Sequence, residues 1–384
     1  MAIQAHYDFI IVGAGPVGML AAIAMANRED TTVCLIDPEK RYKKPKSHPM
    51  TIRQSTYEFL CAMNIWPMLE KNSQPLKQIN LVNNHNFGSV YFKQKPLGYM
   101  IDSAALVDSL HKVISDHHNI AYRWESSVKD IKPCYTDWVC SIQEANQGIE
   151  DILAKRIIAC DGVKSTVCEK LQVEYQELRQ NFLSTVIEIK TSDWPAGSAW
   201  QVVQEGSISG VIPGLNKNSG FVIITSEKHV DNVEQAIESV CLDRLGDIEA
   251  WQACGVMPSY LKSREPIKQA GVIALGNARL ALPPIAAQGF NFAVDDIRTL
   301  AHWQKRGAWQ NMDAKNWQQG WYQQRQPFAE QLYEDMKKIL LHMAQKPSII
   351  SSCINTAAWS WMGCDAKLQH TMYTKGQGMR SIHE

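Results

Sequence analysis

At 384 residues the chain is longer than the roughly 250 to 300 residues at which a single hydrophobic core usually stops growing, which predicts two structural units. Its 39 basic residues balance 39 acidic ones, so the overall charge does not favour a nucleic-acid partner. The ten cysteines form no CxxC pair and no apolar run reaches the length of a membrane span, which argues against a disulfide framework, a zinc site and a spanning helix. We therefore expect a cytoplasmic protein with reduced thiols, no signal peptide and no metal.

The first predicted element is a buried strand over Phe9–Val12, followed by the sequence GAGPVG and an alanine-rich helix. Gly13 permits a tight turn, Gly15 lets the backbone approach a pyrophosphate, and Gly18 lets the helix pack closely on the strand. The start of the helix supplies amides and partial positive charge for phosphates. A second apolar strand ends at Asp37, where a carboxylate can accept both ribose hydroxyls of an adenosine. This pattern predicts a dinucleotide site and disfavours a 2'-phosphate in it.

The elements that follow are a basic loop, interpreted as solvated surface, and a helix predicted over residues 51–66. Residues 76–94 alternate as a β-hairpin, and residues 103–117 place apolar side chains at helical spacing. A strand then leads to a turn at Cys160–Gly162. Strand-rich sequence runs from about Leu183 to Thr225, with STVIEIK, SISGVIPG and GFVIITS as its clearest members.

The order of these elements is a βαβ unit, a block of mostly antiparallel strands, and a return to the apolar segment GVIALGNA. This order predicts a nucleotide-binding domain interrupted by a sheet domain. From Gln326 the chain is predicted to be helical. Its uncharged stretch from Pro347 to Gly363 favours a core-facing helix, with a surface that contacts lipid or a partner as the alternative.

Four segments, taken together in their order and spacing, identify a family more specifically than any one of them alone. They are DFIIVGAGPVGMLAAIAMA, KPLGYMIDSAALVDSL, IIACDGVKSTV and GVIALGNARLALPPIAAQGFNFAVDD. With them the chain resembles the flavin-dependent aromatic hydroxylases of the p-hydroxybenzoate hydroxylase-like fold, and within these the ubiquinone-biosynthesis hydroxylases of the 2-octaprenyl-6-methoxyphenol hydroxylase type. The resemblance implies an α/β fold: a Rossmann-like, GR2-type FAD-binding domain interrupted by a mostly antiparallel β-sheet substrate domain, with a helical C-terminal tail. The expected boundaries are 1–75, 96–170 and 265–325 for the FAD-binding domain, 76–95 and 171–264 for the substrate domain, and 326–384 for the tail.

The resemblance assigns cofactor contacts by position. The glycine motif and Asp37 would hold the adenosine diphosphate half of FAD, and Asp161 with Gly162 would form a turn that supports the strand and the cofactor. Asn277 falls where the family contacts the ribityl and pyrophosphate region, and Pro284 falls beside the isoalloxazine ring. The complete expected cofactor set is Gly13, Gly15, Pro16, Val17, Gly18, Asp37, His48, Val128, Asp161, Gly276, Asn277, Pro284, Gln288, Gly289, Phe290 and Asn291.

The mechanism that the resemblance implies places the chemistry on the flavin: NAD(P)H reduces it transiently, dioxygen gives a flavin hydroperoxide, and an oxygen atom passes to an aromatic ring. No catalytic side chain is expected. Several family residues are replaced, since His48, Ala104 and Cys168 stand where arginine is usual, Asn277 replaces aspartate, Leu280 and Pro283 replace histidines, and Ala287 replaces glycine. Asn277 retains hydrogen-bonding capacity, whereas the lost arginines remove charge-assisted contacts.

Three functions follow as alternatives. The intact glycine motif favours an active monooxygenase that hydroxylates a polyprenylated phenol in ubiquinone biosynthesis. The replaced residues favour a catalytically weakened FAD-fold subunit that serves as a binding or scaffolding partner in a quinone-biosynthesis complex. A hydroxylase of a soluble aromatic metabolite is the third. Peripheral association with the inner face of the membrane and a homodimer are further expectations that the resemblance leaves open.

Overall fold

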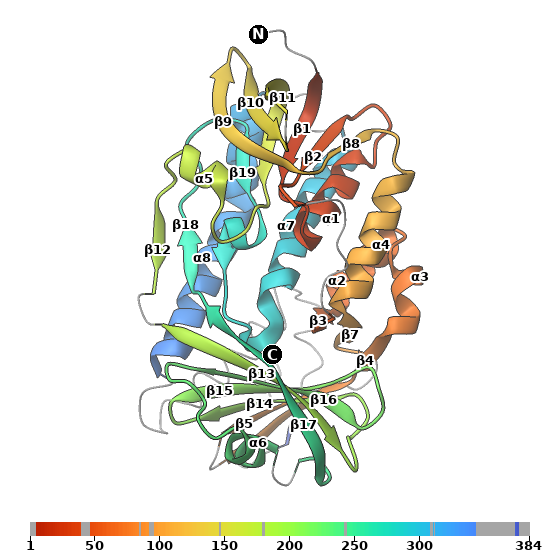
Figure 1. The fold of residues 1–384 in the computed structure, drawn as a ribbon, viewed down its shortest axis with the longest axis vertical. Helices are drawn as coiled ribbons and strands as arrows, with labels where there is room; N and C mark the ends of the chain where they lie inside the picture. The colour runs from red at the N-terminus through yellow and green to blue at the C-terminus, as the bar shows by residue number, and fades with distance from the viewer. Residues whose placement is uncertain are drawn as a thin grey trace.

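The structure, a computed structural model, describes residues 5–39, 47–83, 86–91, 96–145, 147–178, 181–241, 244–307, 310, 312–342 and 373–375. Two large β-sheets lie at opposite ends of the molecule, and long helices pack around the first of them (Figure 1). The predicted α/β fold, with a mostly antiparallel sheet inserted into a nucleotide-binding arrangement, is confirmed.

The first sheet has the strand order β8-β2-β1-β11-β10-β9, and β19 pairs with the C-terminal part of β11. The pairs β1–β2, β1–β11, β2–β8 and β11–β19 are parallel, whereas β10 is antiparallel to both of its neighbours. Phe9, Ile10 and Ile11 are fully buried because helices cover one face of the parallel part, while residues of β9, β10 and the short helix at residues 166–170 pack on the other. The strands are β1 (His6–Val12), β2 (Val33–Ile36), β8 (Ile120–Arg123), β9 (Ser126–Cys134), β10 (Asp137–Glu144), β11 (Ile149–Ala159) and β19 (Val272–Ala274).

The helices beside this sheet form its main core. Helix α1 is buried over almost its whole length and packs against α4 and α7, and the side chains of Trp317 and Trp321 from α8 close the same cluster. Asp102 caps α4 by accepting hydrogen bonds from the amides of Ala104 and Ala105. The helix bounds are α1 (Pro16–Ala26), α4 (Ser103–Asp116), α5 (Thr166–Lys170), α7 (Gln288–Lys305) and α8 (Ala314–His342).

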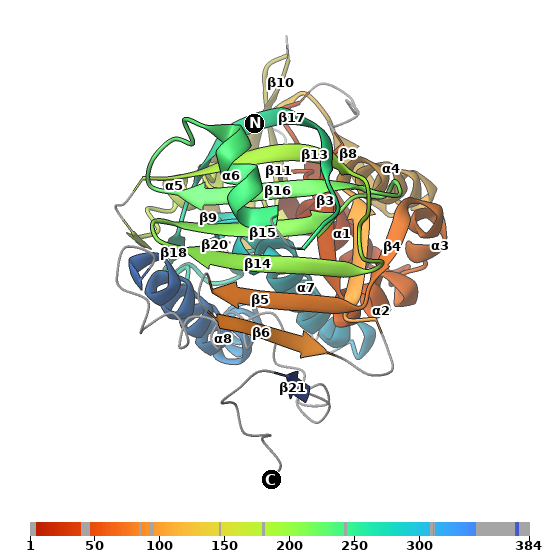
Figure 2. The ribbon, with the colours of Figure 1, turned by 90° about the horizontal axis from the view of Figure 1, so that it is seen from below.

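The second sheet has the order β17-β13-β16-β15-β14-β5-β6-β21, antiparallel except for the parallel pair β14–β5 (Figure 2). Helix α6 (Val233–Cys241) covers its outer face and buries Ile237 and Val240 there. The opposite, inner face is turned towards α7. The strands are β5 (Gln78–Asn83), β6 (Asn86–Tyr91), β13 (Phe182–Thr191), β14 (Ser198–Gln204), β15 (Ser207–Pro213), β16 (Ser219–Ser226), β17 (Ile248–Ser259) and β21 (Tyr373–Lys375).

Two small sheets connect these parts, and one of them includes residues that were predicted to be helical. The helix predicted from residue 51 is wrong at its start, because Pro49–Arg53 forms strand β3 and pairs with β7. This tertiary pairing, which buries Ile52, overrides the local helical pattern. The remaining elements are α2 (Gln54–Ala62), α3 (Trp66–Leu69), η1 (Glu70–Asn72), β4 (Ser73–Leu76), β7 (Gly98–Asp102), β12 (Tyr175–Glu177), β18 (Lys262–Arg264) and β20 (Leu280–Ala281).

The hairpin of β5 and β6, helix α4 and the strands β13, β15 and β16 are confirmed where they were expected. The exact domain boundaries stay predictions. Helix α8 begins at Ala314 and passes through residue 326 without a break, and the uncharged stretch from Pro347 to Gly363 lies outside the described residues. Among the helices that are described, none is long and apolar enough to cross a membrane.

Candidate functional site

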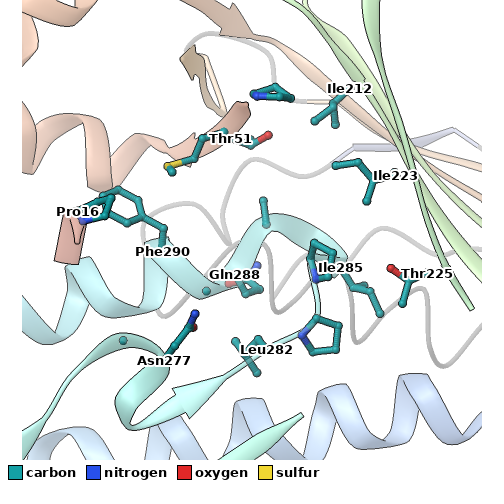
Figure 3. Close-up of a pocket in the computed structure, with 18 of the residues that line it drawn as sticks. Pro16, Thr51, Ile212, Ile223, Thr225, Asn277, Leu282, Ile285, Gln288 and Phe290 are labelled. Atoms are coloured by element: carbon teal, nitrogen blue, oxygen red, sulfur yellow. The ribbon is translucent and has the colours of Figure 1, made fainter. Parts of the chain in front are cut away.

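A cavity of about 510 Å³ lies between the first turns of α1 and α7 on one side and the inner face of the second sheet on the other. Figure 3 shows Pro16, Asn277 and Phe290 on the helix side, and Ile212, Ile223 and Thr225 on the sheet side. Nine residues of the expected cofactor set line it, namely Gly15, Pro16, Val17, Gly276, Asn277, Pro284, Gln288, Gly289 and Phe290, as does Gly162 from the expected Asp-Gly turn. The folded chain thus brings together segments that are more than 250 positions apart in the sequence.

The three motif glycines differ in what surrounds them. A Cβ atom on Gly13, whose φ is 97°, would lie 2.6 Å from the carbonyl oxygen of Cys160, and one on Gly18 would overlap the carbonyl oxygen of Gly13. Both glycines therefore allow α1 to pack on the turn of β1 and β11. Gly15 differs, because apart from its chain neighbours no described atom lies within 4 Å of a Cβ built there. Its open side belongs to the cavity.

The start of α1 carries no side-chain cap. Gly15 is the N-cap residue with extended backbone, Pro16 occupies the first turn, and that turn contains no acidic residue. The first amides of a helix lack intrahelical acceptors, and the helix dipole adds partial positive charge to them. The geometry suits a phosphate group.

The 3-10 turn η2 (Gly276–Ala278) packs directly on this first turn. Gly276 has a φ of 55°, and a Cβ atom on it would lie 3.2 Å from the side chain of Val17. Asn277 follows on the same turn and lines the cavity. An amide at this position offers both a donor and an acceptor without adding negative charge near a phosphate.

The start of α7 follows a second 3-10 turn, η3 (Ile285–Ala287). Ala287 caps α7 in the left-handed conformation, with φ 50° and ψ 38°, which costs a non-glycine residue about 1 to 2 kcal/mol. Alanine at this family glycine position thus adopts a backbone conformation that usually favours glycine. Asn291 secures the turn, because its side-chain nitrogen donates to the carbonyl oxygens of Ala287 (2.7 Å) and Thr51 (3.0 Å).

Asn291 itself is fully buried and does not line the cavity. Its side-chain oxygen accepts from the Arg53 amide at 2.9 Å and from the Thr56 hydroxyl at 2.8 Å. The amide group is thus engaged with protein partners that fix α7 against β3 and α2. Its predicted contact with the cofactor stays untested.

Two acidic residues, Asp37 and Asp161, lie next to segments that line the cavity without lining it themselves. The carboxylate of Asp37 accepts from the Ala14 amide at 2.6 Å and from the Glu39 amide at 2.9 Å, which holds it at the glycine turn. Asp161 accepts from the Val167 amide at 3.2 Å through one oxygen, while its buried Oδ1 has no hydrogen-bond partner among the residues described. Burial raises the pKa of the Asp161 carboxyl, since desolvation outweighs its hydrogen bonds.

Cys160 precedes this aspartate and lines the cavity. Burial, followed by repulsion from the Asp161 carboxylate, raises the pKa of its thiol well above the ordinary value. The raised pKa favours the protonated form of this thiol.

Two further expected cofactor contacts, His48 and Val128, also lie outside the cavity lining. His48 is exposed, and its backbone pairs with Ser103 through bonds of 2.9 and 3.0 Å. Val128 is buried on β9 in the core that β1 and β10 also enter. Whether either residue contacts a cofactor stays a prediction.

Four of the replaced family positions have defined surroundings. Ala104, Cys168 and Leu280 are buried, and the Cys168 thiol lies 3.7 Å from the carbonyl oxygen of Ala278. Pro283 lines the cavity. The first three positions are thus packed in the protein interior, where these apolar side chains contribute to the core.

A buried ion-pair network behind the cavity was not predicted from the sequence. Asp296 is fully buried and accepts hydrogen bonds from Arg279 at 2.8 Å and from Arg325 at 2.6 Å. It thereby joins the residue after η2 to α7 and α8. Arg53 pairs with Asp295 at 2.6 Å in a similar way. These contacts link distant segments, and no local motif signals them.

The sheet side of the cavity was also missed by the sequence prediction. It consists mainly of apolar side chains on alternate positions of β5, β15 and β16, namely Ile79, Ile208, Ile212 and Ile223. Gln201 on β14 is the amide among them. The available signal was a glutamine between the apolar residues Trp200 and Val202 of the strand SAWQVVQ, where a buried polar group requires an explanation.

The sequence of residues 6–335 matches the model of the family described as FAD binding domain. The chain belongs to this family. Ubiquinone hydroxylase UbiM of Neisseria meningitidis serogroup C / serotype 2a is 21% identical over 323 residues, which cover 77% of this chain and 68% of that protein. The 3-demethoxyubiquinol 3-hydroxylase of Escherichia coli strain K12 is 22% identical over 311 residues, 76% of this chain and 78% of that protein.

The fold of this FAD-binding chain is similar to that of p-nitrophenol 4-monooxygenase PnpA from Pseudomonas putida DLL-E4. The TM-score is 0.72 at 16% sequence identity, and the match covers 95% of this chain and 96% of that structure. The predicted resemblance to flavin-dependent aromatic hydroxylases is confirmed. The chain is an FAD-dependent monooxygenase, and FAD is its cofactor.

Proposed function

We propose that this chain hydroxylates the ring of a polyprenylated phenol in ubiquinone biosynthesis, with FAD as the bound cofactor, NAD(P)H as the transient reductant and dioxygen as the oxygen source. The observation that carries the proposal is one cavity that joins a glycine cradle to an apolar sheet wall. Two similar proteins are named as hydroxylases of ubiquinone and of a demethoxyubiquinol, which supports the choice of substrate class.

The residues of the helix side fit FAD. The open space at Gly15 admits a pyrophosphate beside the uncapped start of α1. The unpaired Oδ1 of Asp161 and the amide of Asn277 can bond hydroxyl groups of the ribityl chain. Asp37 lies at the glycine turn, where the adenosine ribose would be bound.

The isoalloxazine ring would lie against Pro284 and the first turn of α7. FAD, once reduced, supplies the activation of dioxygen, so that the overall reaction converts ArH, O₂, NAD(P)H and a proton into ArOH, water and NAD(P)⁺. The protein contributes partial positive charge from the uncapped start of α7 and a wall that excludes water. We assign no catalytic side chain.

A polyprenyl chain partitions into lipid, so the proposal includes a peripheral association with the inner face of the membrane, where the substrate would be taken up. The apolar side chains on the sheet side of the cavity are suited to the prenylated ring.

The proposal is tested with the purified protein, added FAD and 2-prenylphenol under ¹⁸O₂. We expect a yellow protein, NAD(P)H oxidation that 2-prenylphenol stimulates, and a product that carries one ¹⁸O atom. Para-hydroxybenzoate serves as the soluble phenol for comparison.

Each negative result contradicts a different part of the proposal. A protein that takes up no FAD, or one that takes it up without forming labelled product, would support the scaffolding alternative. Labelled product from para-hydroxybenzoate in preference to 2-prenylphenol would support the hydroxylase of a soluble metabolite.

A further inference from the structure

The sheet side of the cavity contains two side chains with amide or hydroxyl groups among its described residues, Gln201 and Thr225. Their neighbours on this face are aliphatic. A polar group on such a wall is costly to bury unless it bonds to something. The partners of these two side chains therefore decide what the wall can recognise.

Thr225 has a protein partner. Its hydroxyl lies 2.8 Å from that of Ser184, which in turn lies 2.5 Å from the hydroxyl of Ser259. These contacts join β16 to β13 and to the edge strand β17. Thr225 thus has a sufficient structural role inside the sheet.

Gln201 has no such partner for its nitrogen. The residue is only 7% exposed, and its buried Nε2 has no hydrogen-bond partner within the described ranges. Most buried amide groups in proteins are hydrogen-bonded, and an exception at a binding cavity calls for a ligand. An NH₂ group in this position is a donor that seeks an oxygen acceptor.

The residue opposite Gln201 on the neighbouring strand is Gly210, which in turn lies opposite Ile223. Gly210 lines the cavity, and no described atom beyond its chain neighbours lies within 4 Å of a Cβ built on it. Glycine in the middle of a strand weakens the strand and often marks the close approach of a ligand. The empty position beside the Gln201 amide leaves room for a flat ring.

We propose that Gln201 is a specificity-determining residue that hydrogen-bonds an oxygen substituent of the aromatic substrate, with the ring seated over Gly210. The inference rests on the proposed function, since it assigns the polar contact of the same substrate. The apolar neighbours hold the ring and the prenyl group, and the amide selects rings that carry an acceptor oxygen beside the prenyl substituent.

The test compares two probes on the FAD-loaded protein: 2-prenylphenol and prenylbenzene, which lacks the oxygen. Binding is followed by the change in the flavin absorption spectrum. We expect the wild type to bind 2-prenylphenol about ten-fold more tightly, the usual worth of one such hydrogen bond. Gln201→Met, which keeps the length of the side chain, should remove most of this preference and leave the affinity for prenylbenzene unchanged.

Gln204→Met is the matched control, because Gln204 lies on the same strand, outside the cavity lining, with its amide directed to the carbonyl oxygen of Ser239 at 3.4 Å. This variant should keep the wild-type ratio of the two affinities. A general loss of structure would weaken both probes alike and leave their ratio intact. Gln201→Leu provides the same comparison if the methionine variant does not fold.

Two results overturn the inference and are distinguishable. If Gln201→Met and Gln201→Leu keep the wild-type preference for 2-prenylphenol, Gln201 does not recognise the oxygen and the proposed function stands. If the FAD-loaded wild type binds neither probe, the proposed substrate class is wrong, and the role of Gln201 falls with it.

Discussion

The two sides of the cavity are fixed in different ways. The helix side consists largely of backbone at Gly15, Gly276 and the turn before α7, held from behind by the buried ion pairs of Asp296. The sheet side consists of side chains that project from strands whose backbone is already paired. A substitution on the helix side therefore changes the fold or the cofactor site, whereas one on the sheet side changes which substrate fits.

The largest expected effect comes from the support of the helix side. Asp296→Ala leaves Arg279 and Arg325 buried without their carboxylate, which should lower the free energy of unfolding by about 3 to 5 kcal/mol. Denaturant titration of the variant measures this loss. Arg298→Ala on the same helix is the control, because its pair with Asp295 is exposed and should be worth less than about 1 kcal/mol. Equal stabilities of the two variants would contradict the supporting role of Asp296.

The second effect separates cofactor binding from folding. Gly15→Val places a Cβ atom where no described atom beyond the chain neighbours lies within 4 Å, at a residue whose φ of −66° valine tolerates. We expect the fold to persist while FAD binding weakens by at least about a hundred-fold, since several charged hydrogen bonds to the pyrophosphate are lost. Fluorescence titration with FAD gives the affinity. The control is Gly148→Val, at an exposed and equally open glycine in the turn before β11, which should bind FAD as tightly as the wild type does. If Gly15→Val also binds FAD with wild-type affinity, the phosphate site does not lie at Gly15.

The smallest effect concerns pH. Burial raises the pKa of the Asp161 carboxyl in the folded protein above its unfolded value of about 3.9. A raised folded pKa means that folding takes up a proton, so this contribution to stability is full below the unfolded pKa and is lost as the pH rises through the folded pKa. Asp161→Asn removes that dependence.

The FAD-free variant should therefore gain melting temperature relative to the FAD-free wild type as the pH rises from about 4 towards neutrality. Calorimetric scans of both proteins across this range measure the difference. A constant difference between their melting temperatures at every pH would show that the Asp161 pKa is not raised.

The contrast between the two sides also explains what could be predicted from sequence. The GxGxxG spacing could be interpreted from sequence because part of its role is local: Gly13 has a positive φ at the turn, and Gly18 packs on the carbonyl oxygen of Gly13 at the helix start. The strands β13, β15 and β16 were found for a related reason, since alternation along one strand reports its own two faces.

The missed features depend on pairing between distant segments. Thr51 and Ile52 form a strand because β7 lies beside them, and Asp296 is buried with two arginines because η2, α7 and α8 meet there. Gln201 gains its significance from Gly210 on the next strand, and no spacing rule connects the two before the register is known. Patterns within one element were thus predictable, and contacts across elements were not.

Cys160 gives the cavity a chemical property of its own. A monooxygenase generates oxidising species close to its own side chains, and thiolates are oxidised far more readily than protonated thiols. Because burial raises the pKa of Cys160, its thiol in the cavity lining should resist oxidation. The exposed Cys61 and Cys254 should be oxidised before it when peroxide is added, which peptide mass mapping would measure. The raised pKa of Cys160 should thus protect the cavity lining from oxidation during turnover.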